Sequence, residues 1–139
     1  MPGDTIYLRG GVHTVQAGIT FTRSGTQAAP IRVLPFPGEH PILDAAGITT
    51  IETWVLRLNG TASWWHIKGL EIRNNPLGGG ITLRDTASHN VIENNEIHHN
   101  GRLSEWAASG ISICYDPAYN LILNNDVHHN ADADFGDGD

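Results

Sequence analysis

The chain has 139 residues, of which 40% are hydrophobic, which is enough apolar material for one folded domain. Its formal charge of −7 argues against nucleic acid as a partner. The start lacks the apolar run of a signal peptide, the sequence shows no membrane span, and the single cysteine permits no internal disulfide. Sixteen Gly and seven Pro favour many turns and an all-β fold.

A repeat of apolar residues runs along the chain from its beginning. The segments TIYL, PIRV, VLRL, GITL and GISI place Ile6, Ile31, Leu56, Ile81 and Ile111 at spacings of 25, 25, 25 and 30 residues. Each segment alternates apolar and variable positions, as a strand does. A second register contains Ile42, Ile67, Ile92 and Ile122, and a third contains Ile72, Ile97 and Val127.

Units with three such segments predict three short strands per unit, stacked about 4.8 Å apart on the strands of the next unit. The predicted fold is therefore an all-β, right-handed parallel β-helix with about five coils of about 25 residues. We expect residues 1–139 to form one β-helix domain that is truncated at both ends. Open ends expose apolar cross-section and strand edges, which predicts self-association through a terminal coil.

Strand alternation also assigns an outward face. In the first register the outward positions are Tyr7, Arg32, Arg57, Thr82 and Ser112. Arg32 and Arg57 would then be stacked, either as an ordinary solvated pair or as a site for a carboxylated sugar.

Asparagine and histidine recur at equivalent positions of later units. NVIENNEIHHN aligns with NLILNNDVHHN, which places Asn94 below Asn124 and Asn95 below Asn125. Inward asparagines at such bends predict a ladder of side-chain amides. The same alignment stacks His98 and His99 on His128 and His129. Adjacent strand residues are expected to face opposite ways, so each face would supply only two metal ligands, which favours stacked turn residues over a zinc site.

Two loops supply the candidate binding residues. The change of period from 25 to 30 residues comes from an insertion, GRLSEWAAS, in which Arg102, Glu105 and Trp106 are suited to substrate binding through charge and stacking. Trp106 folded back as a hydrophobic lid is the alternative. The chain ends in ADADFGDGD, whose carboxylates suit calcium, and a frayed acidic terminus is the alternative. The candidate metal ligands are Asp132, Asp134, Asp137 and Asp139.

The segments GDTIYLRGGVH, GTQAAPIRVLPFPGEHPILD, WHIKGLEIRNN, NNEIHHNG and NNDVHHNADAD together resemble the N-terminal half of family-nine pectate lyases. That resemblance implies a secreted enzyme that cleaves acidic polysaccharide by β-elimination, with calcium as cofactor and a lysine as base. In the family those groups lie on later coils, so no catalytic residue is assigned here. Lys68, the sole lysine, aligns with Glu93 and Leu123 and is not expected to be the base.

The leading functional hypothesis is a fragment or minimal form of a calcium-dependent pectate or polysaccharide lyase that acts on acidic polysaccharide and is inactive in isolation. Two alternatives share the scaffold, because a fold does not dictate a function. One is another carbohydrate-binding or carbohydrate-modifying β-helix, such as a hydrolase or an epimerase. The other is a structural solenoid module without catalysis.

Overall fold

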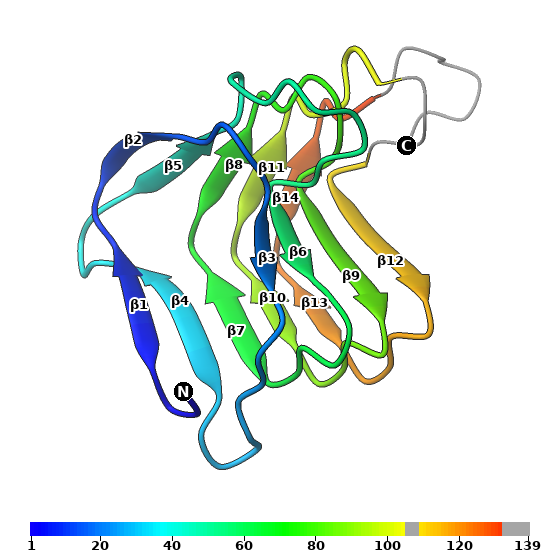
Figure 1. Cartoon of the computed structure of the whole chain (residues 1–139). Coiled ribbons are helices and arrows are strands. Elements are labelled where there is room, and N and C mark those ends of the chain that lie inside the picture. The colour runs from blue at the N-terminus through cyan, green and yellow to red at the C-terminus, as the bar shows by residue number, and fades with distance from the viewer. Residues whose placement is uncertain (105–108, 132–139) are drawn as a thin grey trace.

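The computed structural model describes residues 1–104 and 109–131, and within these ranges every regular element is a β-strand. The chain winds as a parallel β-helix in which each coil contributes one strand to each of three sheets, as predicted (Figure 1). In the described ranges there is no helix with the length and apolar character needed to cross a membrane.

Each sheet takes its strands from successive coils, and all pairings are parallel. Sheet A contains β1 (Thr5–Leu8), β4 (Ile31–Pro35), β7 (Trp65–Lys68), β10 (Val91–Glu93) and β13 (Leu121–Leu123). Sheet B contains β2 (Gly11–Thr14), β5 (Pro41–Asp44), β8 (Glu71–Arg73), β11 (Glu96–His98) and β14 (Asp126–His128). Sheet C contains β3 (Ile19–Phe21), β6 (Leu56–Leu58), β9 (Ile81–Asp85) and β12 (Ile111–Tyr115).

The predicted registers are confirmed in the later coils. Ile67, Ile92 and Ile122 lie opposite one another in sheet A. In sheet B the corresponding column is Ile72, Ile97 and Val127. Lys68 pairs with Glu93, and Glu93 with Leu123, as the alignment indicated.

The register predicted for the first two coils is wrong. Ile6 pairs with Val33 instead of Ile31, and Ile31 pairs with Trp65 of sheet A instead of Leu56. From Leu56 onward this predicted alignment holds, because Leu56, Ile81 and Ile111 lie opposite one another in sheet C. Ile42 lies in sheet B and does not align with Ile67. The connections 22–30 and 45–55 are longer than their counterparts 59–64 and 74–80 in the next coil, and strands of all three sheets share the same alternation, so a false 25-residue match arose.

The predicted stacking of two arginines fails for the same reason. Arg32 lies opposite His66 in sheet A, whereas Arg57 lies opposite Thr82 in sheet C. The Arg57 guanidinium donates to the backbone carbonyl of Glu52 at 3.3 Å.

The three sheets enclose one apolar core. Its central columns are fully buried, and include Ile67 and Ile92, Ile72 and Ile97, and Leu58 and Leu83. The equivalent inward residues of the last coil are open, with Ile122 39% exposed and Val127 45% exposed. The core is therefore continuous along the axis and uncovered at that end (Figure 1).

Asparagine ladders close the bends between the sheets. In each ladder a side-chain amide oxygen accepts from the backbone N–H of the coil below at 2.9 to 3.1 Å, and the amide nitrogen donates to a backbone carbonyl near the same bend. The ladders contain Asn90 and Asn120, Asn95 and Asn125, and Asn75, Asn100 and Asn130. The ladder predicted at Asn95 and Asn125 is thus confirmed, and it is one of three.

The residue before each ladder asparagine has a positive φ and carries its side chain outward. These residues include Asn94 and Asn124, His99 and His129, and His89 and Tyr119. Asn and His tolerate this left-handed conformation better than most side chains do. Each bend therefore has two consecutive positions, of which one faces inward and the other faces solvent.

Candidate functional site

The outward face of sheet B carries two neighbouring columns of ionisable side chains. One column contains Glu71, Glu96 and Asp126, and the other contains Asp44, Arg73, His98 and His128. Sheet pairing places successive members about 4.8 Å apart, so opposite charges in the two columns can meet.

Glu71 is the centre of this network. It is 7% exposed and accepts hydrogen bonds from His40 Nε2 at 2.8 Å, Arg73 Nη1 at 2.7 Å and His98 Nε2 at 3.3 Å. Burial opposes ionisation of Glu71, but these three donors outweigh it and hold its pKa below the usual value. Its oxygens are occupied, so Glu71 organises the face rather than serving as a free base.

Arg73 joins this network to the preceding coil. Its guanidinium donates to Asp44 Oδ2 at 2.9 Å as well as to Glu71. Burial would raise the pKa of Asp44, but hydrogen bonds from Arg73, the Ala46 N–H and Asn74 hold it below its usual value. Both carboxylates are therefore ionised near neutral pH.

The four stacked histidines lie at the far end of the same face, in register as predicted. The rings of His98 and His128 are 5.0 Å apart at 2°, and those of His99 and His129 are 5.0 Å apart at 3°. The expectation that adjacent residues face opposite ways is wrong here, because the φ of His99 is 56° and turns its ring beside His98. The Nδ1 atoms of these two rings are 2.7 Å apart.

Removal from water and the neighbouring imidazoles lower the pKa of His99. Its ring is therefore neutral near pH 7. No group of three or more His, Cys, Asp or Glu in residues 1–104 and 109–131 is arranged to hold a metal ion.

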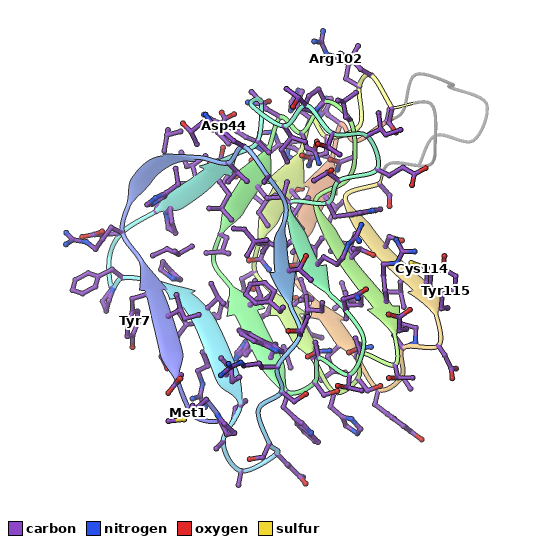
Figure 2. All side chains as sticks on the ribbon, viewed as in Figure 1. Met1, Tyr7, Asp44, Arg102, Cys114 and Tyr115 are labelled. Atoms are coloured by element: carbon purple, nitrogen blue, oxygen red, sulfur yellow. The ribbon has the colours of Figure 1, made fainter. Side chains whose placement is uncertain are left out.

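A recess of about 300 Å³ lies at the bend beyond sheet B. Arg102, His99, Asn74, Pro76 and Ala46 line it. The Arg102 side chain is exposed and lies on the same side of the coils as Asp44, at the top of the view in Figure 2. Of the predicted substrate-binding residues, Arg102 is thus placed at a recess, whereas Glu105 and Trp106 lie outside the described residues.

The backbone on both sides of Arg102 is fixed by hydrogen bonds. Gly101 N–H donates to the Asn75 carbonyl at 2.7 Å, and Leu103 N–H donates to the Pro76 carbonyl at 2.7 Å. The backbone that carries Arg102 is therefore held beside the third asparagine ladder. A guanidinium suits bidentate binding of a carboxylate.

The predicted calcium ligands Asp132, Asp134, Asp137 and Asp139 also lie outside the described residues. Ala131, which precedes them, donates its N–H to the Asn100 carbonyl at 3.1 Å. Gly101 makes the equivalent bond one coil below, to Asn75. Ala131 therefore lies at the same bend as Gly101, one coil further along the axis.

Lys68 lies on sheet A, far along the coil from this recess, and its Nζ contacts Glu93 Oε1 at 3.4 Å. His99 was not singled out as a binding residue from the sequence, and neither was the Asp44, Arg73 and Glu71 network. The signal was present, because Arg73, His98 and His128 each follow the inward residue of the third register.

Comparisons with known proteins agree with this architecture. The family described as "Pel9A-like, right handed beta helix region" matches residues 1–139. Pectate lyase L of Paenibacillus polymyxa is 37% identical over 128 residues, which are 81% of this chain and 27% of that protein. Pectate lyase PEL9 of Emericella nidulans is 34% identical over 102 residues, which are 66% of this chain and 24% of that protein.

Two solved structures share the fold. The crystal structure of pectate lyase Pel9A superposes with a TM-score of 0.75 at 27% identity, over 94% of this chain and 32% of that one. A rhamnogalacturonan lyase gives a TM-score of 0.75 at 21% identity, over 99% of this chain and 37% of that one, and shows likeness of fold alone. The chain thus spans between a quarter and two fifths of the length of these proteins. With a match over its whole length, this chain belongs to the Pel9A-like right-handed β-helix family.

Proposed function

We propose that this chain forms part of a calcium-dependent lyase that cleaves an acidic, pectate-like polysaccharide by β-elimination, and that it is inactive in isolation. The observation that carries the proposal is the identity of 37% to a pectate lyase across 81% of the chain. The recess at Arg102 supports it, because a guanidinium on a hydrogen-bonded backbone is suited to a uronate carboxylate.

In this proposal Arg102 binds a carboxylate of the polysaccharide, and the neutral imidazole of His99 accepts or donates a hydrogen bond at the neighbouring hydroxyl. Glu105 and Trp106 complete the subsite, and Asp132, Asp134, Asp137 and Asp139 contribute oxygens to a calcium site. Calcium bound by a uronate carboxylate would stabilise the charge that develops at the adjacent carbon.

The base is assigned to coils outside this chain. Lys68 is the sole lysine, and it is paired with Glu93 on sheet A rather than placed beside the recess. We also propose an extracellular location, since the substrate is a polymer found outside the cell that degrades it.

Calorimetric titration of calcium into the purified chain, alone and with polygalacturonate, tests the binding part. We expect calcium binding in the micromolar to millimolar range that tightens in the presence of polymer. Asp132→Asn with Asp134→Asn should weaken it, and unchanged affinity in that double variant would count against the calcium assignment.

Affinity for polygalacturonate tests Arg102. Arg102→Gln should lower it about tenfold, since a charge-assisted bidentate contact contributes about 1.5 to 3 kcal/mol. Arg23→Gln is the matched control, because Arg23 is also exposed but lies in the first coil. Equal losses in the two variants would indicate general electrostatics instead of a subsite.

Absorbance of an unsaturated product tests the reaction. The isolated chain should give none, whereas a form extended by the following coils should give product that needs calcium. Reducing ends without ultraviolet absorbance would identify a hydrolase and overturn the lyase assignment.

A further inference from the structure

A second recess, of about 320 Å³, lies at the bend between sheets C and A, on the opposite side of the coils from Arg102. Its wall is the outward column of that bend, made of Trp64, His89 and Tyr119. The rings of Trp64 and His89 are 4.3 Å apart at 18°, and those of His89 and Tyr119 are 5.0 Å apart at 24°. We call these three residues the aromatic strip.

The strip presents ring edges and polar atoms to solvent. His89 is exposed, and Tyr119 is 78% exposed. Among the residues that the structure describes, no hydrogen bond is made by the Trp64 indole N–H, the His89 ring or the Tyr119 hydroxyl. Stacked faces fix the rings, so these groups are ordered without being occupied.

The floor of the recess is apolar and continuous with the face of sheet A. It includes Pro30, Val91 and Leu121, together with the outward ring of His66. These residues come from four successive coils, so the recess extends over about 14 Å along the axis, which is longer than one sugar ring. A pyranose offers C–H groups to such a floor and hydroxyls to such a wall.

The charges beside the recess select the ligand. Arg32 lies directly below His66 in the same outward column, and no carboxylate among the described residues pairs with it. Lys68 lies two residues beyond His66, and both contact Glu93, which is the one acid at the outward positions of sheet A within residues 1–104 and 109–131: His66 Nε2 at 2.8 Å and Lys68 Nζ at 3.4 Å. Arg32 is therefore the cation of this face that no carboxylate of the described residues offsets, on a chain of net charge −7.

We propose that the aromatic strip and the face of sheet A beside it form a second oligosaccharide-binding site that takes sugars carrying carboxylates. Arg32 binds the carboxylate, the strip donates to ring hydroxyls, and the floor covers the C–H face. The acidic ligand class agrees with the proposed function, but it rests here on Arg32 and the strip. The site is spatially separate from the Arg102 recess, so one chain can hold a polymer at two places.

Titration of the full 139-residue chain with tetragalacturonate, followed by backbone amide chemical shifts, distinguishes the two sites. We expect shifts at His89, Tyr119 and His66 that saturate together, with or without shifts at His99 and Arg102. Shifts confined to His99 and Arg102 would overturn the proposal while leaving the proposed function intact.

His89→Asn with Tyr119→Asn tests the strip. Asn occupies the same outward bend position at residues 94 and 124, so the backbone conformation is retained while two rings are removed. We expect the affinity for tetragalacturonate, measured from the amide shifts of the recess beside the strip, to fall at least tenfold. The amide shifts near Arg102 should be unchanged. His129→Asn, at the equivalent position of another bend, is the matched control and should leave the strip affinity unchanged.

Arg32→Gln and a neutral tetrasaccharide test the charge selection. The variant should bind tetragalacturonate about tenfold more weakly, and wild-type affinity should fall as salt is raised. Equal affinity for the neutral and acidic oligosaccharides would overturn the assignment of an acidic ligand. Arg102→Gln tests whether the two sites are independent. Independent sites would lose binding at the Arg102 recess in this variant and keep the amide shifts of the strip.

Discussion

Replacing Asn95 with Ala should destabilise the fold more than any change at an exposed position of the same bend. The Asn95 side chain is 2% exposed. Its Oδ1 accepts from the Leu70 N–H at 3.0 Å, and its Nδ2 donates to the Ile67 carbonyl at 3.2 Å and to Asn125 Oδ1 at 3.0 Å. Asn95→Ala therefore leaves two backbone groups of the coil below without partners.

The cost follows from the burial of those groups. An unsatisfied buried donor or acceptor costs about 1 to 3 kcal/mol, so two of them cost about 2 to 6 kcal/mol. For a chain of this size the thermal midpoint should fall by about 10 °C or more. Differential scanning calorimetry and urea denaturation, with far-ultraviolet circular dichroism as the probe, measure both quantities.

Asn94→Gly provides the control in the adjacent position. Asn94 is exposed, has a φ of 52°, and makes one side-chain hydrogen bond, to Glu93 at 3.3 Å. Glycine adopts that φ without strain, so stability should change by about 0.5 kcal/mol or less. If Asn95→Ala were as stable as Asn94→Gly, the ladder would contribute nothing and the reasoning would be refuted.

Three further predictions concern the sheet B network, a tight turn and the open end. Glu71→Gln should lower the free energy of unfolding by about 2 kcal/mol at pH 7. Because the pKa of Glu71 is lowered in the folded state, the ionised carboxylate stabilises the fold above the ordinary pKa of 4.5, and this stabilisation is lost as the pH falls. The variant should therefore show a shallower acid transition than the parent chain. Gly78→Ala should cost about 1 to 3 kcal/mol in urea denaturation, because the new methyl would overlap the backbone of Thr53. Light scattering should show concentration-dependent association, and Ile122→Asp should reduce it.

Matched variants separate these effects from general damage. Glu96→Gln changes a carboxylate that is 44% exposed and should leave the acid transition as in the parent chain. In Gly47→Ala the nearest atom to the new methyl is in the flexible Gln16 side chain, at 3.2 Å, and the Val15 carbonyl oxygen at 3.5 Å is in ordinary contact, so this variant should be close to neutral. A clean monomer at high concentration would contradict the association prediction.

The fold was predictable because the later coils repeat with little variation. Residues two apart alternate between core and solvent, and three copies of each register define three strands per coil. The same alternation carried no information on which sheet a strand joins. Ile31 was therefore aligned with Leu56, although the long connections 22–30 and 45–55 place the two in different sheets.

The candidate binding residues were only partly predictable. Arg102 was singled out because an insertion marked its loop, and the structure places it at a recess with His99, while its binding role stays a prediction. The aromatic strip was not singled out, because Trp64, His89 and Tyr119 belong to three different residue types and no composition signal links them. Only the shared positive φ of their bend identifies them as one column.

The paired bend positions also separate two kinds of sequence change. The inward ladder asparagines are held in place by their buried partners, whereas the position before each of them holds Asn, His or Tyr in this chain. Side chains at those outward positions repeat at the strand spacing of about 4.8 Å. A β-helix of this kind can therefore exchange one surface row for another, residue by residue, while its core and its register stay unchanged.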